Sequence, residues 1–190
     1  MIPRFYDIQN GSVKVDGSNV KTLNPVSIRK HIGMVPQKAQ LFKGTLRENM
    51  RWGRKNATDE EIYQALEIAQ AKEFVDSKDQ GLDLMIEQNG SNLSGGQKQR
   101  LTIARALVKN PDILILDEVL SVGDAKFRKK SEKKILSMMD KGVTVLFVSH
   151  SLEQVKRICT KAMILENGSI RSIGDIDTVS AEYEEMISGD

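Results

Sequence analysis

The sequence lacks several features that would place it in common classes of protein. It has one cysteine, Cys159, which cannot form a disulfide within the chain and so fits a reducing compartment, with the cytosol as the default. Its 28 basic residues barely exceed its 26 acidic ones, and a net charge of +2 does not give the broad basic field of most nucleic-acid binders. No nucleic-acid partner is therefore expected.

Long apolar runs are also absent. The longest are ILIL and VTVLFV, far short of the ~20 residues that a membrane-spanning helix needs. The start of the chain has no basic region followed by an apolar one, as a secretory leader would have. Any association with a membrane is expected to run through a partner or through sequence outside these 190 residues.

The patterns that are present predict one sizeable core of mixed secondary structure. The first third should contain a strand in GSVKVDG, a helix from Pro25 to about Lys30 capped by Asn24, and a strand in HIGMVPQ. Residues 44–110 are predicted to be mostly helical, and Thr58 with Glu61 forms a capping box at the start of one helix.

The second half of the chain is typical of a parallel sheet. DILIL and VTVLFVS are continuous apolar runs, and the segment between them is long enough for the helix that parallel pairing requires. A further helix is predicted in SLEQVKRICT, and AMILENGSIRSIG predicts a hairpin that turns at Asn167-Gly168. The fold class is therefore α/β.

Polar residues follow both buried strands. Asp117 and Glu118 end the first strand, and Ser149 and His150 end the second, so parallel pairing should bring them to one edge of the sheet. Two carboxylates and an imidazole there suit a magnesium-phosphate site. The alternative is that Asp117 and Glu118 only cap the helix that follows.

The stretch LSGGQ indicates a second phosphate contact. Ser94 can cap the helix that follows, and Gly95 and Gly96 carry no side chains that would keep an anion from the backbone N–H groups. The helix dipole favours negative charge at the same place. Taken alone, this pattern also fits an ordinary glycine-bearing helix start.

Together, GMVPQ, LSGGQ, ILILDE and FVSH resemble, in order and spacing, the nucleotide-binding domain of ATP-binding cassette (ABC) transporters across essentially the whole chain. The resemblance implies a truncated RecA-like P-loop NTPase core with a mostly helical subdomain that carries the LSGGQ signature. It implies one ABC ATPase domain over residues 1–190, with the core in 1–43 and 111–190 and the helical subdomain in 44–110.

The resemblance also implies a function and a set of site residues. The chain would couple the binding and hydrolysis of MgATP to export of a substrate, as an ATPase at the cytoplasmic face of a membrane. Glu118, the base, and His150, which reaches the γ-phosphate, would be catalytic; Gln37, Ser94, Gly95, Gly96, Gln97 and Asp124 would bind the cofactor ATP; Asp117 and Gln37 would hold Mg²⁺.

Two protein partners are implied. In this family two nucleotide-binding domains face each other head to tail, so the signature of one domain contacts the ATP of the other. A transmembrane domain would contact the segment 38–49, whose Leu41, Phe42 and Leu46 would also pack the subdomain.

One part of the family pattern is missing. No G-x-x-x-x-G-K-[ST] loop occurs in the 190 residues, and its amides and lysine make the main contacts to the β- and γ-phosphates. From the resemblance we expect the chain to begin after that loop and to bind ATP only very weakly alone. The strand that feeds the loop lies inside the sheet in this family, so an unpaired strand edge is also expected.

Different parts of the chain resemble different exporters. The first two thirds resemble multidrug and lipid exporters, whereas the last third, with SVGD and VLFVSHSLEQVKRICT, resembles the ATPase subunits that export polysaccharide or teichoic acid. Two other functions remain open: an ABC-type ATPase without a transport role, and a non-catalytic fragment or regulatory partner. The missing loop favours the last of these, whereas Glu118 and His150 argue against it.

Three residues outside the motifs are assigned structural roles. Trp52 is interpreted as a packing residue, His31 as a surface or helix-end residue, and Cys159 as a buried structural thiol.

Overall fold

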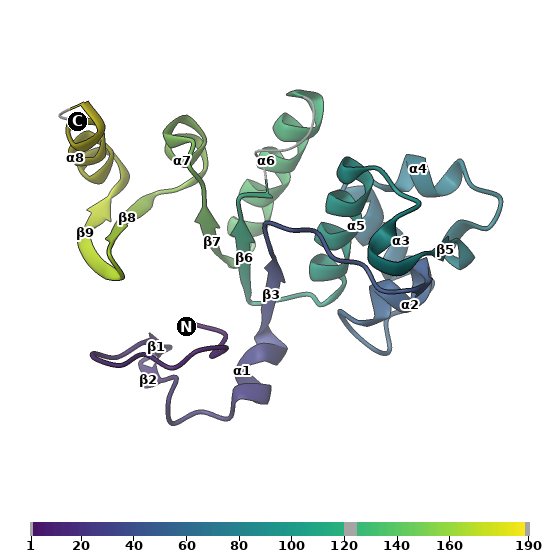
Figure 1. Cartoon of the computed structure of the whole chain (residues 1–190), viewed down its shortest axis with the longest axis horizontal. Helices are drawn as coiled ribbons and strands as arrows, with labels where there is room; N and C mark the ends of the chain where they lie inside the picture. Colours follow the sequence, from purple (N-terminus) through teal and green to yellow (C-terminus); the bar gives the residue numbers. More distant parts are fainter. Residues whose placement is uncertain (1, 120–124, 189–190) are drawn as a thin grey trace.

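A computed structural model describes residues 2–119 and 125–188 of the chain. At its centre lies a three-stranded parallel sheet in the order β3 (Ile32–Val35), β6 (Ile113–Asp117) and β7 (Thr144–Val148) (Figure 1). Leu116 of β6 is registered between Val35 and Phe147 of its neighbours. The parallel sheet and the α/β class predicted from the apolar runs are thereby confirmed.

The N-terminal part forms a small unit on one end of the sheet. Strands β1 (Lys14–Val15) and β2 (Ser18–Asn19) pair around Asp16 and Gly17, which both adopt positive φ angles, as a tight two-residue hairpin requires. Helix α1 (Pro25–His31) follows, and the Asn24 side chain accepts a hydrogen bond from the backbone N–H of Val26, as an N-cap does.

The middle of the chain is mostly helical and lies to the right in Figure 1. It comprises β4 (Gly44–Thr45), α2 (Leu46–Arg51), α3 (Asp59–Ile68), α4 (Lys72–Asp76), a 3₁₀ turn Gly81–Asp83, β5 (Met85–Ile86), a second 3₁₀ turn Gln88–Gly90, and α5 (Gly95–Val108). Capping boxes begin α2, α3 and α5, and the box predicted from Thr58 and Glu61 is confirmed. The core of this helical part is aliphatic, and its Leu46, Leu66 and Leu101 are fully buried.

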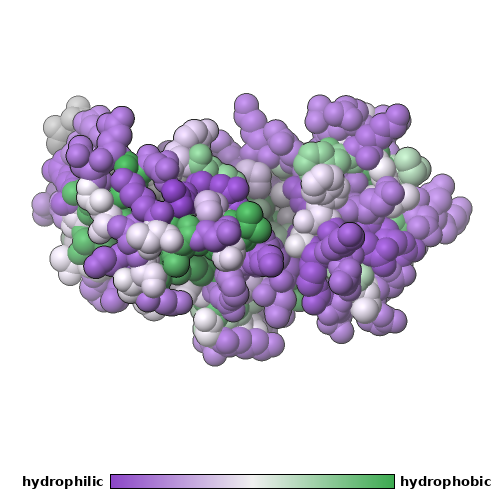
Figure 2. All heavy atoms as spheres, turned by 90° about the horizontal axis from the view of Figure 1, so that it is seen from below, coloured by the Kyte–Doolittle hydropathy of each residue, from purple (hydrophilic) through white to green (hydrophobic). Residues whose placement is uncertain are grey.

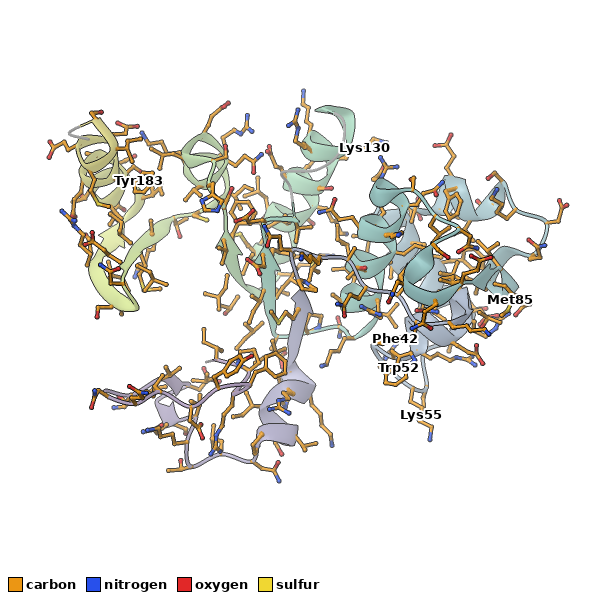
Figure 3. The ribbon with its side chains drawn as sticks, viewed as in Figure 1. Phe42, Trp52, Lys55, Met85, Lys130 and Tyr183 are labelled. Carbon is orange, nitrogen blue, oxygen red and sulfur yellow. The ribbon has the colours of Figure 1, made fainter. Side chains whose placement is uncertain are left out.

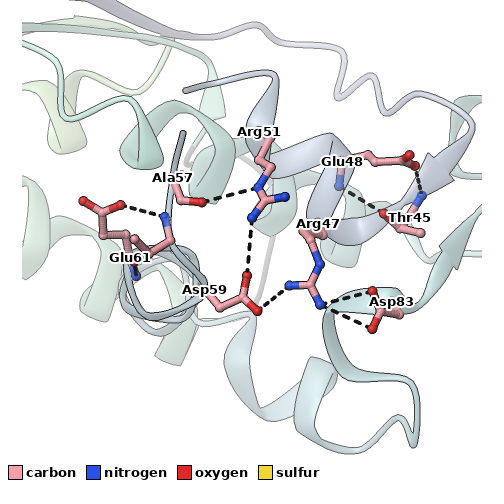
Figure 4. A network of polar contacts seen from close by, with 9 residues as sticks. Thr45, Arg47, Glu48, Arg51, Ala57, Asp59, Glu61 and Asp83 are labelled. Carbon is pink, nitrogen blue, oxygen red and sulfur yellow. Dashed lines mark hydrogen bonds and ion pairs between the residues drawn. The ribbon is translucent and has the colours of Figure 1, made fainter. Parts of the chain in front are cut away.

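A polar network ties these helices together at the surface (Figure 4). Arg47 of α2 contacts Asp59 at the start of α3 at 2.5 Å and Asp83 of the first 3₁₀ turn at 3.1 Å. Arg51, one helical turn on, donates to the carbonyl oxygen of Ala57 at 3.3 Å. One face of α2 is therefore held to two neighbouring segments by its arginines.

The C-terminal part covers the sheet and extends beyond it. It comprises α6 (Ala125–Met139), α7 (Leu152–Ile158), β8 (Lys161–Glu166), β9 (Ser169–Asp175) and α8 (Ile176–Ser188). Ile135 of α6 and Ile158 of α7 pack in one buried cluster with Leu114 and Leu116 of β6. The hairpin β8–β9 was predicted from Asn167-Gly168, whereas α8 was not.

The β8–β9 hairpin exposes an apolar face. Met163 lies opposite Ile173 and Leu165 opposite Ile170, and these four side chains are between 47% and 68% exposed. Figure 2 shows hydrophobic residues in green on the left of the view, the side on which this hairpin lies. Among the described residues, β7 is paired with β6 alone.

None of the helices within residues 2–119 and 125–188 combines the length and the hydrophobicity that crossing a bilayer requires.

Candidate functional site

Three predicted site residues meet at the carboxyl end of the parallel sheet. Gln37 follows β3, Glu118 follows β6 and His150 follows β7. The Gln37 Nε2 donates to Glu118 Oε2 at 3.0 Å, and His150 Nε2 lies 2.6 Å from the other carboxylate oxygen, Oε1. The strand-end rule thus correctly placed Glu118 and His150 at one edge, and the structure adds Gln37 to them.

The backbone around Glu118 aims its carboxylate at this edge. Glu118 adopts a φ of +53°, in the left-handed region that is uncommon for residues other than glycine. Its N–H donates to the carbonyl oxygen of Val148 at 2.9 Å, which continues the pairing of β6 with β7 for one more residue. Such a strained position costs about 1 to 3 kcal/mol and clusters at functional sites.

Burial differs across the cluster. The Glu118 side chain is 19% exposed, whereas the imidazole of His150 is 87% exposed. The carboxylate therefore sits in the sheet edge, and His150 covers it from the solvent side.

Asp117 lies directly beside this cluster as the last residue of β6, in register with Val148. In the part of the chain that the structure describes, no three acidic, histidine or cysteine side chains group as a metal site would. Mg²⁺ needs no such group, because it keeps several waters and is bound by one or two hard oxygen ligands together with substrate phosphates. The carboxylate of Asp117 and the amide oxygen of Gln37 fit that donor set.

The LSGGQ stretch starts α5 as its residues predicted. Ser94 is the N-cap: its Oγ accepts from the Gln97 N–H at 3.2 Å, and Gln97 Oε1 accepts from the Ser94 N–H at 2.9 Å. A Cβ added at Gly95 or Gly96 would meet no atom of the described chain within 4 Å. The glycines are thus not required by packing, which leaves the N-terminus of α5 open to a ligand.

Among the described residues, the LSGGQ residues and the sheet-edge cluster of Gln37, Glu118 and His150 make no hydrogen bond to each other. Ser94 and Gln97 bond to each other. Asp124, with the rest of the stretch 121–124, lies outside the described residues.

Gln99 is a link that the sequence reasoning missed. This side chain on α5 is buried, and its Nε2 donates to the carbonyl oxygen of Val119 at 2.6 Å, immediately after Glu118. The signature helix is therefore fastened to the segment that carries the carboxylates. The sequence carries no signal for this bond, because its acceptor is a backbone carbonyl that only the fold identifies.

A groove lies on another face of the molecule, between α1, α2 and α5. It encloses about 310 Å³, and its charged and aromatic lining residues are Phe5, Arg29, Phe42, Trp52, Arg105 and Lys109; this set is called the cationic-aromatic groove below. Phe42 belongs to the predicted partner segment 38–49. Arg29, Arg105 and Lys109 were not singled out from the sequence, because they come from helices far apart along the chain.

Trp52 only partly fulfils its predicted packing role. Its ring lies 4.9 Å from that of Phe42 at an angle of 34°, yet the residue is 69% exposed (Figure 3). It therefore forms a wall of the groove.

His31 and Cys159 were also assigned structural roles from the sequence. His31 is the exposed last residue of α1, as expected, and its Nδ1 lies 2.6 Å from Asp112 Oδ2. Cys159 is only half-buried, next to the cluster around Ile158, and this burial raises the pKa of its thiol.

Comparison with known proteins places these features in a family. The family described as ABC transporter matches residues 1–121. The uncharacterized ABC transporter ATP-binding protein YwjA of Bacillus subtilis is 42% identical over 168 residues, which are 88% of this chain and 29% of that protein. A putative multidrug export ATP-binding/permease protein of Staphylococcus aureus is 39% identical over 191 residues, 99% of this chain and 33% of its own length.

A solved structure agrees with these relatives. The structure of a bacterial Atm1-family ABC exporter with ATP bound superposes with a TM-score of 0.90 at 30% identity, over 98% of this chain and 33% of the exporter chain. The chain thus spans about a third or less of the length of these relatives. The Staphylococcus match includes the last third of the chain, so the distinct origin suggested for that part stays a prediction. The chain belongs to the ABC transporter family.

Proposed function

We propose that this chain is the ATP-hydrolysing part of an ABC exporter. The observation that carries the proposal is the cluster at the sheet edge, where Gln37 and His150 hold the two oxygens of Glu118 beside Asp117. Charge-neutralising ligands, a carboxylate and a hydrogen-bond donor at one strand edge are what phosphoryl transfer to water needs.

Each residue of the cluster has a role in this proposal. Asp117 and Gln37 would hold Mg²⁺, which when bound neutralises charge on the phosphate oxygens. Glu118 would orient the attacking water and accept its proton. His150, exposed at the edge, would turn from Glu118 to donate a hydrogen bond to a phosphate oxygen.

The signature would act on a nucleotide held by a second nucleotide-binding domain. Ser94, Gly95, Gly96 and Gln97 present backbone N–H groups at the open start of α5, apart from the cluster around Glu118. In a head-to-tail dimer they would complete the partner's ATP site, with Asp124 beside it. Loss of the bridging γ-phosphate on hydrolysis would then weaken the dimer.

The second partner in this proposal is a transmembrane domain. The segment 38–49 forms part of the cationic-aromatic groove through Phe42. We assign the groove to that domain, which would hold the chain at the cytoplasmic face of a membrane. Residues 44–110 would move as a helical subdomain against a core made of residues 1–43 and 111–190.

Nucleotide binding in a mixture tests the proposal. The purified 190-residue chain, which has no G-x-x-x-x-G-K-[ST] loop, should bind fluorescent MgATP only weakly alone. Binding should become strong when an intact ABC ATPase domain with its catalytic glutamate changed to glutamine is added. A Gly96→Glu variant is the matched control, because a carboxylate at the start of α5 should repel the phosphates without a clash in the chain.

Two results would contradict the proposal: micromolar binding by the chain alone, or a mixture that binds no better than the intact domain by itself. The absent loop also favours a second candidate, a non-catalytic partner that only completes another domain's site. Binding in the mixture without phosphate release, after the loop is supplied ahead of this chain, would favour that candidate.

A further inference from the structure

One polar side chain lies in the buried contact between α5 and the segment that follows β6. Gln99 is on α5, five positions after the N-cap Ser94, and the residue is 5% exposed. Its Nε2 donates to the carbonyl oxygen of Val119 at 2.6 Å, across 20 positions of the sequence. The bond therefore marks the place where the helix that begins with LSGGQ holds the chain just beyond the strand that carries the carboxylates.

The amide of Gln99 is satisfied at one end. Its Oε1 is buried and has no hydrogen-bond partner among the described residues. A buried amide oxygen without a partner is costly, so a side chain that served packing alone would be apolar, as the buried Leu101 and Ala104 of the same helix are. The bond to Val119 is the contact for which this position needs an amide.

The acceptor of that bond belongs to the residue directly after Glu118. Glu118 has a φ of +53°, and residues other than glycine keep such a conformation only where the surrounding structure holds them. Two hydrogen bonds flank it: its own N–H donates to the carbonyl oxygen of Val148 at 2.9 Å, and the next carbonyl, that of Val119, accepts from Gln99. The backbone turn at Glu118 is thus held on both sides.

Helix α5 is a firm support for this contact, because it is packed into two cores. Leu101 lies in the core of the helical part, and Ala106 lies in the same buried cluster as Leu116 of β6. The Val119 side chain, 1% exposed, belongs to that second cluster. Donor and acceptor are therefore both attached to closely packed parts of the molecule.

The contacts of the Glu118 carboxylate itself are less permanent. One of its oxygens bonds to His150, whose side chain is 87% exposed. In the proposed function His150 turns toward a phosphate oxygen, so the carboxylate loses this contact when a nucleotide is bound. The bond from Gln99 acts on the backbone, and it does not depend on that change.

We propose that Gln99 is a positioning residue for Glu118. Its Nε2 holds the Val119 carbonyl oxygen and so fixes the backbone turn that directs the Glu118 carboxylate toward the attacking water. This inference rests on the proposed function, because that function makes Glu118 the group that accepts the proton. Gln99 is buried, and it acts on the reaction only through the backbone of Val119.

Hydrogen exchange in the 190-residue chain tests the backbone contact without any nucleotide. Gln99→Met removes the donor and keeps a side chain of similar length. Protection of the Glu118 amide, measured by NMR, should fall about 10-fold, which is the effect expected when one buried hydrogen bond is lost. The amide of Leu116 inside β6 and the amides inside α5 should keep the protection that they have in the parent.

Thr102→Val is the matched control. Thr102 is another buried polar side chain of α5, but its Oγ1 donates to the carbonyl oxygen of Lys98 in the same helix at 2.9 Å. The variant loses a buried hydrogen bond on α5 and leaves the bond from Gln99 to Val119 in place, so protection of the Glu118 amide should not change. Urea unfolding of both variants establishes that each is folded.

Phosphate release separates positioning from a role in folding alone. The chain is joined behind a segment that supplies a G-x-x-x-x-G-K-[ST] loop, and a second intact domain is present. Gln99→Met should slow single-turnover release by about 10- to 100-fold, as a small misplacement of a reacting group does. The affinity for MgATP should be unchanged, because the capping box of Ser94 and Gln97 is intact, and Thr102→Val should release phosphate at the parent rate.

Three results would overturn the inference: equal protection of the Glu118 amide in Gln99→Met and the parent, a loss of protection that extends along all of α5 and β6, or phosphate release by Gln99→Met at the parent rate. The exchange measurement needs no ATPase activity. A parent that hydrolyses no ATP would therefore contradict the proposed function and leave the exchange result standing, whereas an active parent matched by Gln99→Met would remove the role of Gln99 alone.

Discussion

Gln37 and Glu118, 81 positions apart in the sequence, are joined by a hydrogen bond of 3.0 Å from the amide Nε2 to the carboxylate Oε2. The bond connects the loop after β3 to the loop after β6, on neighbouring strands of the sheet. A residue that senses a metal ion and a residue that handles water would thus be in direct contact before any nucleotide arrives. Mg²⁺ would bind the other end of the same amide, the Gln37 oxygen, so the bond from Nε2 to Glu118 could persist when the ion is held.

Glu118→Gln should slow hydrolysis strongly while it keeps the cluster assembled. The measurement is single-turnover phosphate release by this chain joined behind a segment that supplies a G-x-x-x-x-G-K-[ST] loop, in the presence of a second intact domain. The rate should fall by about 10²- to 10⁴-fold, because glutamine keeps the shape of the side chain but cannot accept a proton. Nucleotide binding should persist.

Glu153→Gln provides the matched control for that experiment. Glu153 is an exposed carboxylate on α7 that pairs with Arg157 at 3.1 Å, and no described contact joins it to Gln37, Glu118 or His150. Its loss should leave phosphate release unchanged. A Glu118→Gln protein that releases phosphate at the parent rate would remove Glu118 from the proposed chemistry.

Two glycine substitutions should separate ligand binding from packing. Gly95→Ala places a Cβ in open space at the start of α5, so the free energy of unfolding should stay equal or rise by up to ~1 kcal/mol. ATP binding in the mixture with an intact domain should nevertheless weaken, because the methyl group occupies the approach to the backbone N–H groups. Urea denaturation and nucleotide titration measure the two effects.

Gly53→Ala, unlike Gly95→Ala, should destabilise the fold. Its Cβ would overlap the carbonyl oxygen of Arg105, on the helix that floors the groove, so the backbone must shift. The free energy of unfolding should fall by about 1 to 3 kcal/mol, as for overpacking elsewhere. If Gly95→Ala were the more destabilising of the two, the open space at the signature would not exist in solution.

Sequence patterns predicted the features that depend on local chemistry. Asn24 as a cap, the Thr58 capping box and the two apolar strands follow from side-chain geometry and periodicity within a few residues. The rule that ligand groups gather at the carboxyl ends of parallel strands then brought Glu118 and His150 together without any coordinates.

The features that were missed depend on contacts between distant segments. The cationic-aromatic groove needs Arg29 from one helix to face Arg105 from another, and no spacing in the sequence encodes that meeting. The bond from Gln99 to the Val119 carbonyl oxygen likewise has a backbone acceptor, which carries no residue signature. Residue types therefore identified the chemistry at the sheet edge, and only tertiary packing identified the second surface.

Lowering the pH should reduce the contribution that Glu61, at the start of α3, makes to the free energy of unfolding. The Arg54 guanidinium and the Thr58 backbone N–H hold the pKa of Glu61 below its ordinary value of 4.5. A carboxyl with a lowered folded-state pKa adds stability above its unfolded pKa, and this stability is lost as the pH falls through the folded value. Glu61→Gln should thus be less stable than the parent in urea at pH 7, and the two proteins should converge as the pH falls through the folded-state pKa of Glu61. A difference that stays constant as the pH falls would show that Glu61 acts by packing. Glu60→Gln, one exposed position away, should have a smaller effect, because what it loses is the interaction of a first-turn carboxylate with the helix dipole.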